Sequence, residues 1–122
     1  MILADTSIWI DHFRIGSAEM IRQLENRRIA THPFVIAELA LGSLRDRATT
    51  LATLDHLPQL HVARITEVRT MIEERSLYST GIGLTDAHLI ASIFLNPPAR
   101  LWTRDKRLRA VAEALAIHID LA

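Results

Sequence analysis

Cysteine is absent from this chain of 122 residues. That absence excludes a disulfide framework, a thiolate nucleophile and cysteine-based zinc sites. Long apolar runs are absent too, because the longest uncharged apolar stretch, residues 89–95, is far shorter than the roughly 18 residues of a membrane span. The first residues have no basic segment, and Asp5 precedes any long apolar core, unlike a secretory signal. We therefore expect a soluble, cytoplasmic protein with no membrane partner.

Lysine is nearly absent, since Lys106 is the only lysine and every other cationic side chain is an arginine. The 14 basic and 14 acidic residues give a net charge of zero, which argues against a nucleic-acid coat protein that binds without regard to sequence. Arginine forms two-pronged contacts with phosphate and stacks on bases. A GC-rich genome that favours arginine codons explains the same excess.

The length fits one domain, here residues 1–122, and the chain has no linker, repeat or low-complexity tract. Short apolar segments predict strands at residues 2–4, 29–31, 61–65, 99–102 and 117–121. Helical spacing, with Ser17 and Thr66 as N-caps and Pro33 at a first position, predicts helices at residues 6–13, 18–26, 33–41, 44–56, 66–78, 85–95 and 108–115. This alternation predicts an α/β fold with a central parallel sheet flanked by helices on both faces.

Ligands of such sheets bind beyond the carboxyl ends of the strands, which directs attention to acids that follow strands. Asp5 follows the first strand and Asp105 follows the strand at residues 99–102, so both are expected at the same edge. Asp86 lies in the first turn of an almost wholly apolar helix. Glu38 lies within the apolar segment 34–41, where a solvated face does not readily explain it.

Clustered acids repel one another and raise their own pKa values, a cost that a divalent cation removes. Mg²⁺ and Mn²⁺ prefer carboxylate and water oxygens, activate water and neutralise charge on a phosphate. The residues therefore suggest metal-assisted hydrolysis of a phosphodiester. Each acid also has a simpler explanation: Asp5 and Asp86 as helix caps, Asp105 as the start of a turn, and Glu38 as an ion-pair partner of Arg45.

Four segments resemble motifs of one known family, in the family's order and over essentially the whole chain. They are ILADTSIWIDHFR (residues 2–14), FVIAEL (34–39), LTDAHLIA (84–91) and LWTRDKRL (101–108). They resemble the motifs of PIN domains of VapC-type toxins. The last motif departs from the family pattern, because no aromatic residue follows its final acid.

The resemblance implies an endoribonuclease that is the toxin of a type II toxin–antitoxin pair. It implies that Asp5, Glu38, Asp86 and Asp105 form the catalytic metal centre for Mg²⁺ or Mn²⁺, and that Glu38 and Asp105 bind the metal or orient the attacking water. Thr6 and Thr103 match hydroxyl positions that support the site or touch substrate phosphate. The implied partners are an RNA substrate, a VapB-type antitoxin and a second copy of the chain in a homodimer.

Several other polar residues are not assigned to the site, and two other classes of protein lack their motifs here. We expect His12 and His32 at the surface or at helix ends, Asp11 in solvent or paired with Arg14, and no catalytic triad for Ser7. A haloacid-dehalogenase-type phosphatase needs Asp-x-Asp after the first strand, where this chain has Asp-Thr-Ser. A phosphoacceptor receiver domain needs paired acids there. The remaining alternative is a PIN-like module that binds RNA or protein without cutting.

Overall fold

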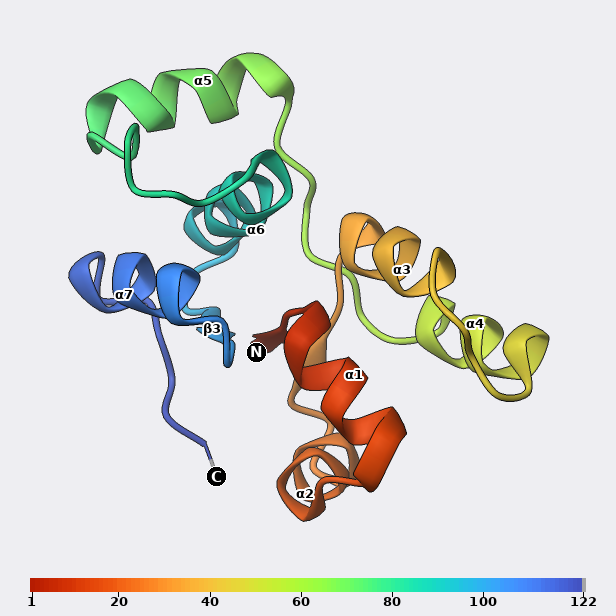
Figure 1. Ribbon diagram of the computed structural model, residues 1–122. Helices are drawn as coiled ribbons and strands as arrows, with labels where there is room; N and C mark the ends of the chain where they lie inside the picture. Colours follow the sequence, from red (N-terminus) through yellow and green to blue (C-terminus); the bar gives the residue numbers. More distant parts are fainter. Residues whose placement is uncertain (122) are drawn as a thin grey trace.

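The computed structural model describes residues 1–121 and contains a parallel three-stranded sheet in the order β2–β1–β3 (Figure 1). Its strands are β1 (Ile2–Ala4), β2 (Ile29–Ala30) and β3 (Arg100–Trp102). The helices in these residues are α1 (Thr6–Ile15), α2 (Ala18–Glu25), α3 (Pro33–Ala40), α4 (Arg47–Asp55), α5 (Ile65–Glu74), α6 (Leu84–Leu95) and α7 (Lys106–Ala114). The predicted α/β class and parallel sheet are confirmed.

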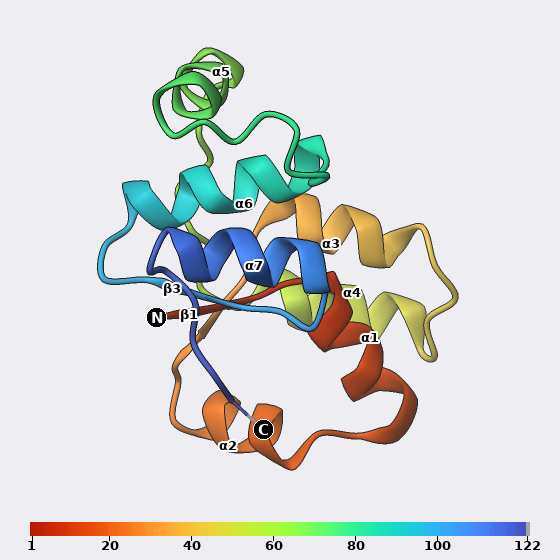
Figure 2. The ribbon, with the colours of Figure 1, turned by 60° about the vertical axis from the view of Figure 1, so that its left-hand side comes forward.

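The centre of the sheet is the β1–β3 pair, in which Leu3 aligns with Leu101 and Ala4 with Trp102. Leu3 and Leu101 are fully buried. Figure 2 shows the strands with α6 and α7 on one side and α2 on the other, so both faces of the sheet are covered. This burial explains why β1 and β2 are continuously apolar rather than alternating.

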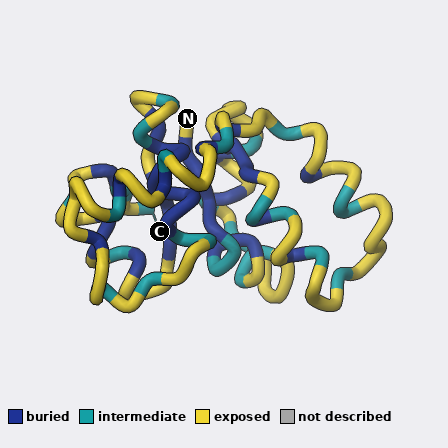
Figure 3. Tube along the Cα trace, turned by 90° about the horizontal axis from the view of Figure 1, so that it is seen from above, coloured by how far each residue is buried: buried dark blue, intermediate teal, exposed yellow. Residues whose placement is uncertain are grey.

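Residues at the centre of the molecule are buried, and residues at its periphery are exposed, as Figure 3 shows. Most residues of α4 are exposed. Local capping explains where two helices begin: the Ser17 hydroxyl accepts the Met20 N–H at 3.1 Å, and Pro33 opens α3. None of the helices in residues 1–121 is both long and apolar enough to cross a membrane.

The strand predicted at residues 61–65 is wrong. The chain runs beside β2 only at the bridge between Thr31 and Gln59, and residues 61–64 lie outside any strand. The helix that follows begins at Ile65 and not after Thr66, because the Glu67 carboxylate accepts the main-chain N–H of Arg64 at 2.8 Å. This local hydrogen bond starts α5 before a longer strand is possible.

The strand predicted at residues 117–121 is also reduced to a single bridge, between His118 and Leu101. Leu101 donates its N–H to Ile117 at 2.8 Å and accepts that of Ile119 at 2.9 Å. Helix ends shift as well: α4 begins at Arg47 rather than Leu44, α5 ends at Glu74, and α7 begins at Lys106 because Asp105 caps it.

Candidate active site

The carboxyl ends of β1 and β3 bring Asp5 and Asp105 to the same edge of the sheet. The main-chain N–H of Asp5 donates to the carbonyl of Trp102 at 3.1 Å. Each acid also caps the next helix, since Asp5 accepts the Ile8 N–H at 3.2 Å and Asp105 accepts the Leu108 N–H at 2.9 Å. The capping role and the placement at the sheet edge are therefore compatible, because each cap uses only one carboxylate oxygen.

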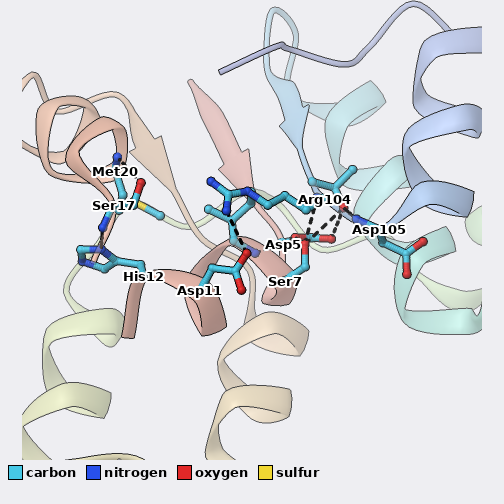
Figure 4. Close-up of polar contacts among 10 residues, drawn as sticks. Asp5, Ser7, Asp11, His12, Ser17, Met20, Arg104 and Asp105 are labelled. Atoms are coloured by element: carbon cyan, nitrogen blue, oxygen red, sulfur yellow. Dashed lines mark hydrogen bonds and ion pairs between the residues drawn. The ribbon is translucent and has the colours of Figure 1, made fainter. Parts of the chain in front are cut away.

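Asp5 is held by two hydroxyl groups (Figure 4). Ser7 Oγ donates to Oδ1 at 2.5 Å, and Thr103 Oγ1 donates to Oδ2. Each hydroxyl in turn accepts a main-chain N–H of the turn after β3: Ser7 from Arg104 and Thr103 from Asp105, both at 3.0 Å. The turn is thereby connected to both oxygens of Asp5.

The Asp5 carboxyl is only 5% exposed, and this burial raises its pKa, while the hydrogen bonds from Ser7 and Thr103 act to lower it. Those donors stabilise the charged form, the one that accepts hydrogen bonds and binds cations. The environment of Asp5 therefore offsets part of the cost of burying a carboxylate.

Glu38 is exposed on α3, so the expectation that it avoids a solvated face is wrong. Val35 and Leu39 of the same helix are buried in the core, whereas Glu38 borders a groove of about 750 Å³ between α1, α3 and α4. Its Oε1 accepts the Thr6 hydroxyl at 2.9 Å, which connects it to the residue after Asp5. Its polar partner is thus Thr6 rather than Arg45.

Asp86 is half-buried in the first turn of α6, and its pKa is raised to about 6. Burial is the largest cause, followed by the negative charges of Asp105 and Asp5, and Glu38 adds to the effect. The other three predicted acids therefore act electrostatically on Asp86. Within residues 1–121, however, no three acidic or histidine side chains already stand close enough to form a metal-binding group.

The four acids and the hydroxyl groups beside them fit a hard divalent cation. Their donors are carboxylate oxygens with hydroxyl groups beside them, and residues 1–121 offer no thiolate. Mg²⁺ and Mn²⁺ favour such oxygen donors, and Mg²⁺ usually keeps several waters, so it does not need a closed cage of protein ligands. A cation among the acids would also relieve the repulsion that raises the pKa of Asp86.

The side chains not assigned to the site have other partners. His12 Nδ1 accepts the Ser17 N–H at 3.1 Å beyond the end of α1, and His32 caps α3 through the Phe34 N–H at 3.0 Å, as helix-end roles predict. Asp11 pairs with Arg104 at 2.9 Å rather than with Arg14. Packing of the turn between β3 and α7 on α1 brings Arg104 to Asp11. Helical spacing suggests only the nearby Arg14 and cannot reveal this partner.

Ser7 is the site residue that the sequence reasoning missed. It lies two residues after Asp5, in the first turn of α1, where a hydroxyl can return to the carboxylate of the cap. The sequence pattern excludes a catalytic triad for Ser7 and indicates no other role for it. Its position in Asp5-Thr6-Ser7 was the signal that it supports the acid instead.

We expect Ser7→Ala to lower metal affinity or cleavage rate by about tenfold, because Asp5 loses its 2.5 Å donor and the Arg104 N–H loses its acceptor. Metal titration of RNA cleavage measures the effect, and Ser7→Thr should restore part of it. Thr49→Ala, at an exposed position of α4, is the control for loss of a hydroxyl. Unchanged metal dependence in Ser7→Ala would rule out the supporting role.

Comparison with known proteins agrees with this geometry. The model of the PIN domain family matches residues 2–114, which include the four acids. Ribonuclease VapC32 of Mycobacterium tuberculosis (strain CDC 1551 / Oshkosh) is 46% identical over 110 residues, covering 90% of this chain and 89% of the relative. Ribonuclease VapC32 of strain ATCC 25618 / H37Rv matches with the same identity and coverage. The chain therefore belongs to the PIN-domain family, and within it to the VapC-type ribonucleases.

Proposed function

We propose that this protein is a divalent-metal-dependent endoribonuclease, the toxin of a type II toxin–antitoxin pair, in which Asp5, Glu38, Asp86 and Asp105 form the metal centre. The observation that carries the proposal is that Asp5 and Asp105 meet at one edge of the sheet, where the Thr103 hydroxyl donates to Asp5 and accepts the main-chain N–H of Asp105. Burial and then the charges of Asp105, Asp5 and Glu38 raise the pKa of Asp86, and a bound cation would offset this cost. Membership of the VapC-type ribonucleases supports RNA as the substrate.

Bound Mg²⁺ or Mn²⁺ would lower the pKa of water and offset charge that develops on the phosphate. Hydroxyl side chains of this chain position the acids for that chemistry. Ser7 and Thr103 donate to Asp5, which orients its carboxylate and favours its ionised form, and Thr6 holds Glu38 at the edge of the groove. Glu38 and Asp105, both exposed, would bind the metal or orient the attacking water.

In the hydrolysis, a water oxygen forms a bond to phosphorus, the bond from phosphorus to the 3′ oxygen breaks, and a proton passes to that leaving oxygen. The products are a 3′-hydroxyl and a 5′-phosphate. Thr6 and Thr103 were predicted to touch phosphate or to support the site. Both hydroxyls donate to acids, which favours the supporting role.

We propose a VapB-type antitoxin and a second copy of the chain as protein partners, a single domain over residues 1–122, and action in the cytoplasm, where RNA is available. The alternative function is a PIN-like module that binds RNA or protein without turnover. The intact set of four acids favours the nuclease, because a binding module has no need of them.

The test is to incubate the purified, folded, antitoxin-free protein with total bacterial RNA in the presence of Mg²⁺, Mn²⁺ or EDTA. We expect discrete fragments with metal and intact RNA with EDTA, and sequencing of the fragment ends identifies the target. Fragments that ligate through their 5′ ends without kinase treatment carry the expected 5′-phosphate. Intact RNA with every metal would instead favour the binding module.

A further inference from the structure

The turn that carries Asp105 also carries exposed cations, namely Arg104, Lys106 and Arg107. RNA is a polyanion, and its backbone must approach the carboxylates of the proposed metal centre, so positive side chains are needed there. Arg104 is engaged with Asp11 at 2.9 Å. Within residues 1–121, in contrast, Arg107 has no acidic partner.

Arg107 lies against Gly81, in the loop before α6. A β-carbon built on Gly81 would lie 3.1 Å from Cδ and 3.4 Å from Nη1 of Arg107. Gly81 has φ of +86°, a conformation that glycine adopts readily and other residues rarely do. The missing side chain thus leaves room for the arginine to cover the loop. This contact limits the freedom of a long side chain, which lowers the entropy lost when it binds a ligand.

The contact links the N-terminal ends of α6 and α7, where Asp86 and Asp105 lie. Helix α6 begins at Leu84, shortly after Gly81, and Asp86 lies in its first turn. Helix α7 begins at Lys106, directly after Asp105. Arg107 therefore lies at the border of the acidic edge rather than on a remote surface.

We propose that Arg107, seated on Gly81, binds a backbone phosphate of single-stranded RNA beside the scissile bond. The inference rests on the proposed nuclease function and names a substrate contact for it. A guanidinium offers parallel N–H donors that match two phosphate oxygens. Because the contact is with phosphate, it positions the strand without reading its sequence. Loss of Arg107 should therefore affect KM more than kcat.

The kinetic test uses a short single-stranded RNA that contains a cleavage site, at several salt concentrations. We expect Arg107→Ala to raise KM about 5- to 10-fold, to change kcat less than about twofold, and to lower the slope of log KM against log salt by about 0.7. Arg107→Lys should restore part of the affinity, because it keeps the charge but not the paired donors. Unchanged KM and slope in Arg107→Ala would overturn the inference while cleavage remains.

Arg69→Ala is the matched control. Arg69 is exposed on α5, which Figures 1 and 2 show on the far side of α6 from the strands, and it has no ion-pair partner in the described chain. Its removal subtracts the same charge, so an equal rise in KM for both variants would mean that only overall charge matters and would also overturn the inference.

A binding measurement separates this inference from the nuclease function. Fluorescence anisotropy gives the affinity of the Asp5→Asn protein for short single-stranded RNA of random sequence, with and without Arg107→Ala. If Arg107→Ala weakens binding about 5- to 10-fold, the phosphate contact is supported. This holds even if the wild-type protein cuts no RNA, in which case only the nuclease proposal fails. Equal binding by both proteins rejects the contact whether or not the wild type cleaves RNA.

Discussion

Asp5→Asn is expected to lower the rate of RNA cleavage by at least about 100-fold while the protein stays folded. Asparagine keeps one oxygen, and it is as good an N-cap as aspartate, so the hydrogen bond from Ile8 that begins α1 survives. The amide has lost the negative charge and presents an NH2 group to either Ser7 or Thr103, where the carboxylate accepted from both. A cation would then lose a charged ligand at an acid that three hydrogen bonds hold in place.

Cleavage of RNA at saturating Mg²⁺ and at saturating Mn²⁺ measures this effect, and circular dichroism checks the fold. Asp55→Asn, an exposed acid at the end of α4, is the control for the same chemical change and should retain full activity. Activity of Asp5→Asn within about threefold of wild type would remove Asp5 from the metal centre. An equal loss in Asp55→Asn would point to a general effect of charge.

Asp86→Asn is expected to abolish cleavage and, at the same time, to stabilise the protein at neutral pH. The pKa of Asp86 is about 6 in the folded protein, against 3.8 for an unperturbed aspartate side chain, so the folded state binds more protons than the unfolded state between these values. Stability is therefore fully present below about pH 4 and declines as pH rises through about 6. For a half-buried group screened by solvent, the cost is on the order of 1 kcal/mol.

Thermal unfolding with EDTA between about pH 4 and about pH 8 measures the second prediction. We expect the Tm of Asp86→Asn to exceed that of wild type by about 3–5 °C at neutral pH and to match it near pH 4. Mg²⁺ or Mn²⁺ should raise the Tm of wild type more than that of the variant, because binding stabilises the folded state. Asp55→Asn should show neither effect, and an Asp86→Asn protein less stable than wild type at neutral pH would contradict the electrostatic account.

The sequence predicted the parts of the site that depend on local pattern. A buried apolar strand followed directly by an acid placed Asp5 at the end of β1 and Asp105 beyond β3, and parallel strands bring their carboxyl ends to one edge. The motif order predicted the family, and helical spacing placed Asp86 in the first turn of α6. Ser17 and Pro33 predicted helix starts because capping depends on residues close in sequence.

The extent of strand pairing and the exposure of side chains were less predictable from the sequence. The segment at residues 61–65 has the apolar content of a strand, but pairing requires a neighbour, and the chain leaves the sheet after Gln59. The apolar surroundings of Glu38 suggested burial, whereas the orientation of α3 on the core turns this carboxylate towards the groove. Both depend on how elements pack, which residue type alone does not specify.

By itself, the sequence determined the fold class, the family and the acids that follow strands, because these depend on composition, period and order. Only the tertiary structure decided which side chains hold those acids. Thr103 donates to Asp5 and Arg104 pairs with Asp11 because β3 pairs with β1 and brings the turn after β3 to that edge. Arg107 lies on Gly81 because the start of α7 contacts the loop before α6. The first two contacts join residues more than 90 positions apart. Such contacts follow from packing, since no local spacing brings their partners together.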